Sequence, residues 1–232
     1  MIKNTVRMTE DLLLLFMTGG AIAKWRGSQP EYVIESIPDE QESRFNDVIA
    51  DRMGRVFCGT MPTAGRPGRL YRLDTDGSVH PLMEDIGVPN GMGFTLDRQG
   101  MYYTDLLARC IYLFDYDAQT GMLSNRRIWL RMPKGEGVPD GMTVDSQGHI
   151  WSARWGAAVH RYTPDGVEER RVTFPAKKVT SVAFGGDDLS DLYITTALAD
   201  GLRAEEGAGA GALFCLQAGV RGVPEFFSRV TI

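Results

Sequence analysis

The sequence predicts an all-β protein of the β-propeller class, and three observations lead to this prediction. Short apolar runs alternate with turns rich in Gly, Asp and Asn, and no stretch shows convincing helical periodicity. The runs group in fours with a repeat of about 40 to 50 residues, which is typical of propeller blades. A polar residue also recurs at the head of each group, and a β-sandwich would not require this.

The chain has 232 residues, and we expect a single domain, 1–232, built from about five four-stranded units. The units are predicted at 1–43, 44–87, 88–137, 138–178 and 179–232. The first unit is expected to be incomplete. It carries a hairpin signal, in which Gly19-Gly20 joins the apolar runs Leu12–Thr18 and Ala21–Trp25. A third strand is predicted at Tyr32–Ile37.

The strands of the later units are predicted from apolar runs bounded by turn residues. The second unit should contain strands at Asp47–Ala50, Val56–Thr60, Arg69–Asp74 and Val79–Met83. The third should contain Gly91–Leu96, Met101–Asp105, Cys110–Asp117 and Arg126–Leu130. The fourth should contain Met142–Val144, Ile150–Arg154, Ala158–Thr163 and Glu168–Thr173. The last should contain Ser181–Phe184, Asp191–Thr196 and Gly211–Leu216, with an irregular end near Pro224–Phe227.

A fixed spacing of polar residues and glycine relates the units. The pattern Asn-x4-Asp-x2-Gly that begins at Asn46 recurs as Asp-x4-Asp-x2-Gly at Asp140. The copy that begins at Asn90 carries two extra residues before its Asp. If the units superpose, one polar side chain from each unit opens the innermost strand and converges on the pseudo-symmetry axis at one mouth of the channel. These residues are Asn46, Asn90, Asp140 and Thr180.

The donor types at these positions suit a hard divalent cation. Asn46, Asn90 and Asp140 offer two amide oxygens and one carboxylate, which are ligands that calcium and magnesium prefer. No Cys or His falls in this register, so a thiolate and imidazole site is excluded. A simpler interpretation also stays open, in which the Asn-Gly and Asp-Gly steps are only turn residues that open a strand.

Composition excludes several classes of partner. The formal net charge of −5 gives no basic surface for nucleic acid or for an anionic membrane. Three cysteines without a C-x-x-C pair argue against a disulfide framework or a structural zinc site. The apolar run Leu12–Met17 is too short to span a membrane, and acidic residues precede it. We therefore expect a cytoplasmic protein.

Other signals in the chain point to structural roles. The histidines His80, His149 and His160 belong to neither a G-x-S-x-G nor an H-E-x-x-H motif, and the last two are expected on the surface. The tryptophans Trp129, Trp151 and Trp155 lie in or near strands and are expected in the core, although Trp155 could reach the channel.

Seven motifs, taken in order, closely resemble the gluconolactonase, regucalcin (senescence marker protein) and luciferin-regenerating enzyme family. They are Arg44-x-Asn46-Asp47, Gly59-Thr60-Met61, Asn90-Gly91, Phe114-Asp115-Tyr116-Asp117 with Thr120-Gly121, Ser124-Asn125-Arg126-Arg127, Pro139-Asp140-Gly141-Met142, and Thr180-Ser181 with Phe184-Gly185-Gly186. The resemblance runs from about residue 10 to the C-terminus. It implies a propeller of the six-bladed type and hydrolysis of a sugar-acid lactone that depends on one divalent metal ion: calcium, zinc, magnesium or manganese.

The resemblance also implies roles for single residues. Asn90 and Asp140 match the metal ligands, and Asp140 matches the residue proposed as the base. Asn46 matches a residue beside the metal that contacts substrate or water, and Arg44 matches the substrate-binding arginine. A small sugar lactone is thus the expected partner of the chain.

The sequence departs from the family pattern in two places. Residues 1–43 lack the Gly-Glu-Gly-Pro-type motif that supplies a glutamate ligand in the family's first blade, so most of that blade is expected to be missing. The loop after Gly59-Thr60-Met61 lacks the acidic residue found in some members. Two explanations follow: the native protein begins upstream, or the chain is a degenerate propeller without catalysis that binds a metal or a small ligand. A propeller that serves as a protein-interaction platform is a third class, supported by the fold alone.

Overall fold

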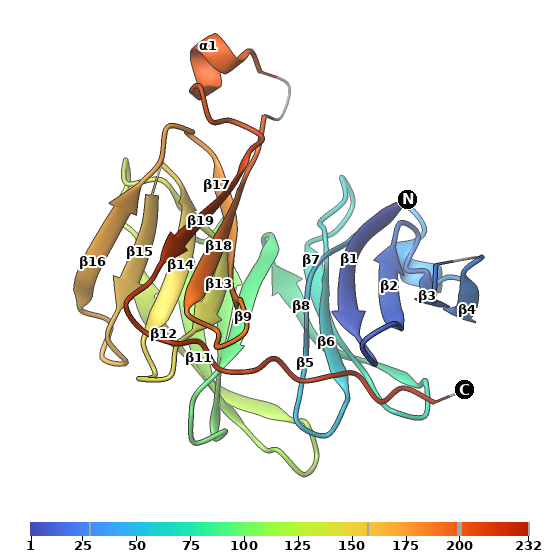
Figure 1. The fold of residues 1–232 in the computed structure, drawn as a ribbon. Helices are drawn as coiled ribbons and strands as arrows, with labels where there is room; N and C mark the ends of the chain where they lie inside the picture. Colours follow the sequence, from blue (N-terminus) through green and yellow to red (C-terminus); the bar gives the residue numbers. More distant parts are fainter. Residues whose placement is uncertain (28, 157, 199–200, 232) are drawn as a thin grey trace. The chain divides into compact units, whose positions relative to one another are not determined.

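The computed structural model describes residues 1–27, 29–156, 158–198 and 201–231, and within them the chain is almost entirely β-structure. Five antiparallel sheets are formed, four with four strands and one with three (Figure 1). Each sheet is a meander in which consecutive strands pair, as in the blade of a propeller. The predicted all-β propeller class is confirmed. In the described part of the chain, no helix is long and apolar enough to cross a membrane.

The contacts divide the chain into two compact units, and the first consists of Met1–Pro89, Tyr116–Ser124 and Glu225–Ile232. It holds two sheets. The strands of the first sheet are β1 (Ile2–Arg7), β2 (Leu13–Met17), β3 (Ile22–Trp25) and β4 (Glu31–Ile34). After a 3-10 turn at Pro38–Glu40, the second sheet contains β5 (Phe45–Ala50), β6 (Val56–Thr60), β7 (Gly68–Leu73) and β8 (Val79–Ile86).

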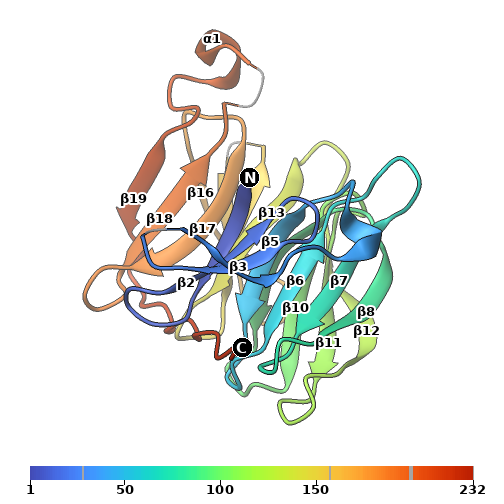
Figure 2. The same cartoon turned by 90° about the vertical axis from the view of Figure 1, so that its right-hand side faces the viewer.

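The second unit consists of Asn90–Asp115 and Asn125–Pro224. One sheet contains β9 (Pro89–Phe94), β10 (Gly100–Asp105), β11 (Cys110–Tyr116) and β12 (Leu123–Arg131). The next contains β13 (Val138–Val144), β14 (Ile150–Trp155), β15 (Ala158–Tyr162) and β16 (Glu168–Thr173). The last contains β17 (Val179–Gly185), β18 (Asp191–Thr196) and β19 (Leu213–Gln217), with the short helix α1 (Arg203–Glu206) before β19. Figure 2 shows β19 at the free edge of this sheet.

The incomplete sheet is the last one, so the prediction that the first unit would be incomplete is wrong. The strand that completes the first sheet is β1, which the sequence did not reveal because only Ile2 and Val6 in it are strongly apolar. β1 is stabilised by its pairing with β2, which places Val6 of β1 opposite the apolar Leu14 of β2. The segment near Pro224–Phe227 forms no strand.

The predicted hairpin between β2 and β3 is confirmed in its turn chemistry. Gly19 and Gly20 have φ of +74° and +72°, a backbone region that residues other than glycine rarely adopt. Positive φ at both central positions is the condition for the tight turn whose twist matches the strands. The Gly-Gly pair is therefore required by the backbone.

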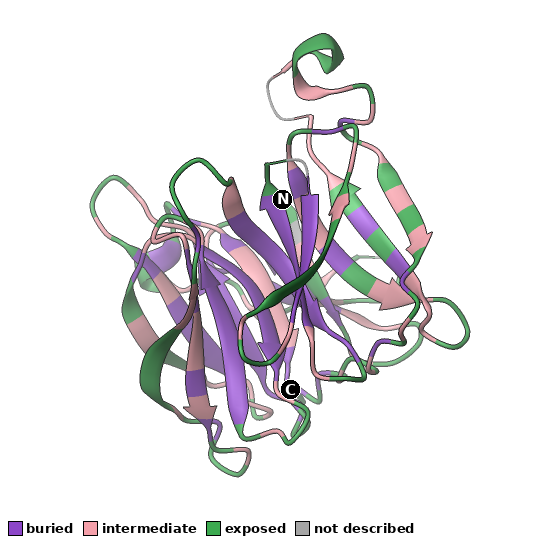
Figure 3. Cartoon of the chain, turned by 90° about the vertical axis from the view of Figure 1, so that its left-hand side faces the viewer, coloured by how far each residue is buried: buried purple, intermediate pink, exposed green. Residues whose placement is uncertain are grey.

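In the two sheets β9–β12 and β13–β16, the first strand is almost entirely buried and the fourth is mostly exposed (Figure 3). In the sheet β13–β16, six of the seven residues of β13 are buried, whereas five of the six in β16 are exposed. Apolar side chains from neighbouring sheets of the same unit pack into common clusters. One of these joins Trp151 and Val159 to Val182 and Ile194. The first strands β9 and β13 are thus enclosed by packed side chains, which favours a fixed geometry for a site that they carry.

The aspartates of the repeated pattern anchor the turns. Asp51 is fully buried and accepts hydrogen bonds from the backbone N–H groups of Met53 and Arg55. Asp145 is equally buried and accepts the same two bonds from Gln147 and His149. This part of the repeat is structural, because each carboxylate ties the turn between the first two strands of its sheet.

A one-residue irregularity recurs at the head of the first strand in several sheets. In β5, Asn46 and Asp47 together lie opposite one residue of β6. In β13, Asp140 and Gly141 lie opposite one residue of β14. In β17, one extra residue, Thr180, is inserted opposite β18. These are β-bulges, which bend a strand and redirect its side chains. The repeat noticed in the sequence therefore corresponds to a repeated backbone feature.

Candidate functional site

In the first unit, the structure joins Arg44 and Asn46, the two residues predicted to bind substrate. Arg44 lies just before β5, and its Nη1 donates to Oδ1 of Asn46 at 2.8 Å and to the carbonyl of Phe45 at 3.0 Å. The Nδ2 of Asn46 donates to the carbonyl of Pro89 at 2.7 Å. Partial burial lowers the pKa of the Arg44 guanidinium, and an arginine still stays charged in proteins. The amide of Asn46 thus fixes the orientation of the positively charged Arg44 guanidinium.

Asn4, which sequence reasoning missed, supports the same place from β1. Its Nδ2 donates to the carbonyl of Asn46 and to Oδ1 of Asp47, both at 3.0 Å. Burial raises the pKa of Asp47, and hydrogen bonds from the Val48 N–H and from Asn4 act in the opposite direction. The bulge of β5 is thus held from both its backbone and its side chains. The missing signal was the strand β1 itself, which shows no clear apolar pattern.

In the second unit, Asn90 and Asp140 lie on neighbouring first strands, β9 and β13, and both are nearly buried. Asn90 is 5% exposed and Asp140 is 9% exposed. The backbones meet beside them, because a Cβ placed on Gly91 would lie 2.7 Å from the carbonyl oxygen of Asp140 and 2.4 Å from the Met142 nitrogen. Burying two polar side chains at such a contact costs free energy unless hydrogen bonds or a bound ligand satisfy their polar atoms.

The glycines after Asn90 and Asp140 serve this close approach and are not turn residues. Gly91 and Gly141 lie inside β9 and β13, and neither has a positive φ. A Cβ on Gly141 would lie 2.4 Å from the Oγ of Ser181 in β17. The simpler interpretation, in which Asn-Gly and Asp-Gly only open a turn, is therefore wrong for these two copies. Thr180, the next residue in the repeat, shares a 2.8 Å hydrogen bond with Thr195.

One carboxylate oxygen of Asp140 is held by a tryptophan. The Nε1 of Trp155, the last residue of β14, donates to Oδ2 of Asp140 at 2.7 Å. Trp155 is 36% exposed, so it is not a core residue. The expectation that Trp155 belongs to the core is therefore wrong, and its reach toward the channel stays a prediction.

The donors present fit a hard divalent ion in type. Asn90 contributes an amide oxygen and Asp140 a carboxylate, both nearly removed from water, which is the ligand chemistry of calcium and magnesium sites. Within the described residues, no group of three or more His, Cys, Asp or Glu side chains could hold a metal.

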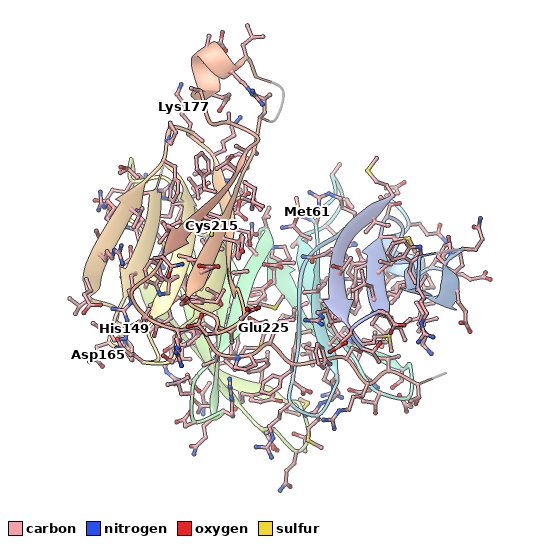
Figure 4. The ribbon with its side chains drawn as sticks, in the orientation of Figure 1. Met61, His149, Asp165, Lys177, Cys215 and Glu225 are labelled. Atoms are coloured by element: carbon pink, nitrogen blue, oxygen red, sulfur yellow. The ribbon has the colours of Figure 1, made fainter. Side chains whose placement is uncertain are left out.

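The histidines lie elsewhere. His149 sits by the turn at the end of the sheets, away from the end marked by Lys177 (Figure 4). His160, which was expected on the surface, is only 3% exposed. Its Nδ1 donates to Oε2 of Glu168 at 3.0 Å, and its ring stacks on Tyr162. Burial, with the nearby charge of Arg154, lowers the pKa of His160. The prediction that His160 is exposed was wrong because the face of the sheet on which a strand residue lies depends on the strand register, which the sequence does not show.

Residues 2–198 match the family described as SGL, the SMP-30/Gluconolactonase/LRE-like region. The pentonolactonase XacC of Haloferax volcanii is 53% identical over 200 residues, which cover 83% of this chain and 69% of that protein.

Two solved structures are similar over nearly the whole chain. A luciferin-regenerating enzyme superposes with a TM-score of 0.88 at 28% identity, covering 99% of this chain and 82% of that one. A regucalcin from Agrobacterium tumefaciens, described as a calcium-binding protein, superposes with a TM-score of 0.85 at 27% identity, covering 98% and 79%. The family model matches most of the chain and the pentonolactonase exceeds half identity, so the resemblance noted in the motifs is confirmed. The chain belongs to the SMP-30/gluconolactonase/LRE-like family.

Proposed function

We propose that the chain hydrolyses a sugar-acid lactone with the help of one divalent metal ion. The observation that carries the proposal is Asp140, a carboxylate 9% exposed on a first strand whose backbone meets β9 beside Asn90. The family supports it, as does the name of the pentonolactonase that is 53% identical. We infer that the substrate is an aldonolactone.

In this proposal, Asn90 and Asp140 hold the ion, which would be calcium, zinc, magnesium or manganese. The regucalcin structure described as calcium-binding supports a divalent ion of this kind. When bound, the ion supplies positive charge that polarises a lactone carbonyl. The rest of the chemistry belongs to the side chains.

Asp140 takes a proton from a water molecule whose oxygen attacks the carbonyl carbon of the lactone. The ring C–O bond then breaks, and the ring oxygen takes the proton that Asp140 received from the water, so that Asp140 is regenerated and the product is the open hydroxy acid. Arg44 donates hydrogen bonds to oxygens of the sugar, and its fixed orientation against Asn46 keeps the entropic cost of this contact low. Asn46 contacts the substrate or the attacking water.

A second function has one observation in its favour. Asp140 is the only carboxylate at the repeated positions Asn46, Asn90, Asp140 and Thr180, and fewer charged ligands give weaker calcium binding. Under this alternative the chain binds a metal or a small ligand without turning over a lactone. It differs from the first proposal in one measurement, the rate of hydrolysis.

The decisive experiment is hydrolysis of a panel of aldonolactones, with a chelator and with each of the four ions added back. Asp140→Ala should abolish the hydrolysis that the ion restores. Asp165→Ala is the matched control, because Asp165 is an exposed carboxylate in the turn between β15 and β16 of the same unit (Figure 4). Hydrolysis that survives both the chelator and Asp140→Ala would overturn the proposal. Ion binding without hydrolysis would establish the alternative.

The remaining expectations from the sequence stay predictions. These are the single domain over 1–232, the cytoplasmic location, and the absence of a nucleic-acid or membrane partner.

A further inference from the structure

We propose that Trp155 is a positioning residue for Asp140, and that Lys178 and Glu206 hold Trp155 in place. The four residues form a continuous series of contacts inside the second unit, from the segment that carries α1 to the carboxylate assigned to the metal ion. The inference rests on the proposed function for the role of Asp140. It adds residues that neither the sequence motifs nor the family resemblance singled out for a role.

The first contact is the hydrogen bond from the Trp155 indole to Asp140. Trp155 lies opposite Val138, two residues before Asp140, and the bulge at Asp140-Gly141 intervenes between the two registers. A bulge redirects the side chain of the residue it contains. The 2.7 Å bond to Oδ2 therefore determines where a carboxylate on an irregular piece of backbone points. A carboxylate fixed before the ion arrives loses less conformational freedom on binding.

The backbone of Trp155 is itself closely packed. A Cβ placed on Gly137 would lie 2.1 Å from the Trp155 carbonyl oxygen, and Gly137 has φ of +76°. The N–H of Gly156 donates to the carbonyl of Lys177 at 2.9 Å. The indole is thus attached to a backbone position with little freedom, and its orientation depends mainly on what covers its ring.

Lys178 covers that ring. It pairs with Trp155 as an isolated antiparallel bridge, and its Nζ lies 5.5 Å from the centre of the indole. A cation over the face of an indole is attracted by the ring electrons and draws them toward itself. This makes the indole N–H a better donor to an anion, and neighbouring hydrogen bonds strengthen each other in this way. The positive charge therefore acts on Asp140 through the tryptophan.

Glu206 fixes the position of Lys178. Its Oε1 accepts from Nζ at 2.8 Å, and its backbone carbonyl accepts from the N–H of Lys177 at 2.8 Å. The side chains of Lys178 and Glu206 are 22% and 16% exposed, so the ion pair is poorly screened by water. The other carboxylate oxygen of Glu206 is buried without a hydrogen-bond partner among the described residues. Glu206 therefore depends on Lys178, and the loss of either residue should release Trp155.

The test measures ion binding as well as catalysis. Calcium and manganese chloride are titrated calorimetrically into the metal-free protein and into Trp155→Phe and Lys178→Met. Trp155→Phe keeps an aromatic ring under Lys178 and removes the N–H together with the five-membered ring that carries it, a loss of volume that the Trp129→Phe control shares. We expect about 10- to 100-fold weaker ion binding for Trp155→Phe, the usual effect of removing a group that orients a metal ligand. A smaller loss is expected for Lys178→Met.

Trp129→Phe is the matched control. Its indole Nε1 also donates a 2.7 Å hydrogen bond, to the carbonyl of Pro164 by another turn of the same unit, and ion affinity should not change. Saturating ion should restore lactone hydrolysis in Trp155→Phe with an unchanged KM for the lactone, which a general loss of structure would not allow. A nitrogen-15 spectrum adds a readout without metal, since the indole N–H resonance of Trp155 should move in Asp140→Asn.

Three outcomes count against the inference. Unchanged ion affinity in Trp155→Phe, with wild-type binding intact, would overturn it while the proposed function stands. If the indole N–H resonance of Trp155 has the same chemical shift in Asp140→Asn as in the wild type, the hydrogen bond between Trp155 and Asp140 is absent. That result would also overturn the inference. A wild-type protein that binds neither ion and hydrolyses no lactone would overturn the proposed function and this inference together. Failure of this inference alone is recognised by wild-type protein that still binds the ions.

Discussion

Arg44 and Asn46, two residues apart at the head of β5, are joined by a 2.8 Å hydrogen bond from Nη1 to Oδ1. The same guanidinium nitrogen also reaches the Phe45 carbonyl. The substrate-binding arginine implied by the motif resemblance is thus oriented by its own strand. A planar guanidinium can hold two such acceptors and still present further N–H groups, whereas an ammonium group cannot match this geometry.

We expect Arg44→Lys to lower kcat/KM for an aldonolactone by about 10- to 100-fold, mainly through KM. A hydrogen bond to a charged group contributes about 1.5 to 3 kcal/mol, which corresponds to this range. The measurement is steady-state hydrolysis with ion at saturation. Arg52→Lys is the control, because Arg52 is an exposed arginine in the turn after β5. An unchanged KM in Arg44→Lys would remove Arg44 from the substrate site.

The close approach of β9 and β13 yields a prediction about stability. Gly91→Ala should lower the free energy of unfolding by about 1 to 3 kcal/mol, the usual cost of overpacking. The reason is that the new Cβ would lie 2.4 Å from the Met142 nitrogen and 2.7 Å from the Asp140 carbonyl. Urea denaturation of the wild type and of Gly91→Ala measures the difference in their free energies of unfolding. Gly65→Ala is the matched control, since its Cβ would meet nothing within 4 Å. Equal midpoints for both variants would contradict the strand contact.

The fold could be read from the sequence wherever apolar residues alternate with Gly, Asp and Asn turns. β6, β16 and β18 begin and end at the residues predicted for them. The strand β1 could not be found in this way, because a polar strand is stabilised by the sheet it joins and not by its own pattern. For the same reason the first sheet was expected to be incomplete, although the incomplete one is the last.

The spacing of the repeat identified residues of the candidate site, but it did not predict their hydrogen-bond partners. Spacing alone singled out Asn46 and Asp140, because the same bulge requires the same position in each repeat. The partners Asn4 and Trp155 come from a neighbouring sheet and a neighbouring strand. Their positions depend on strand pairing and on the bulge, neither of which changes the local sequence pattern.

Thiol reactivity should distinguish the three cysteines. Cys215 lies on β19 (Figure 4) and is exposed, whereas Cys58 and Cys110 are buried according to their accessible surface. Burial raises the pKa of the thiols of Cys58 and Cys110 and suppresses the reactive thiolate. A chromogenic disulfide reagent at pH 8 should therefore modify one thiol per native chain rapidly, and all three after unfolding in denaturant. The fast reaction should disappear in Cys215→Ser. Two or three fast thiols in the native protein would contradict the burial of Cys58 and Cys110.

The buried His160 should make the protein less stable in mild acid. Its pKa is lowered in the folded state, first by burial and then by Arg154, although its hydrogen bond to Glu168 acts in the opposite direction. The unfolded chain takes up a proton near pH 6.5, the ordinary histidine value, while the folded chain does not. The stability that neutral His160 provides is therefore complete above this pH and is lost as the pH falls below it, at most by about 1.4 kcal/mol per pH unit. Urea unfolding between pH 7.5 and 5 should show this slope in the wild type and a smaller one in His160→Gln. Identical slopes in the wild type and in His160→Gln would show that His160 is protonated as readily in the folded chain as in the unfolded one.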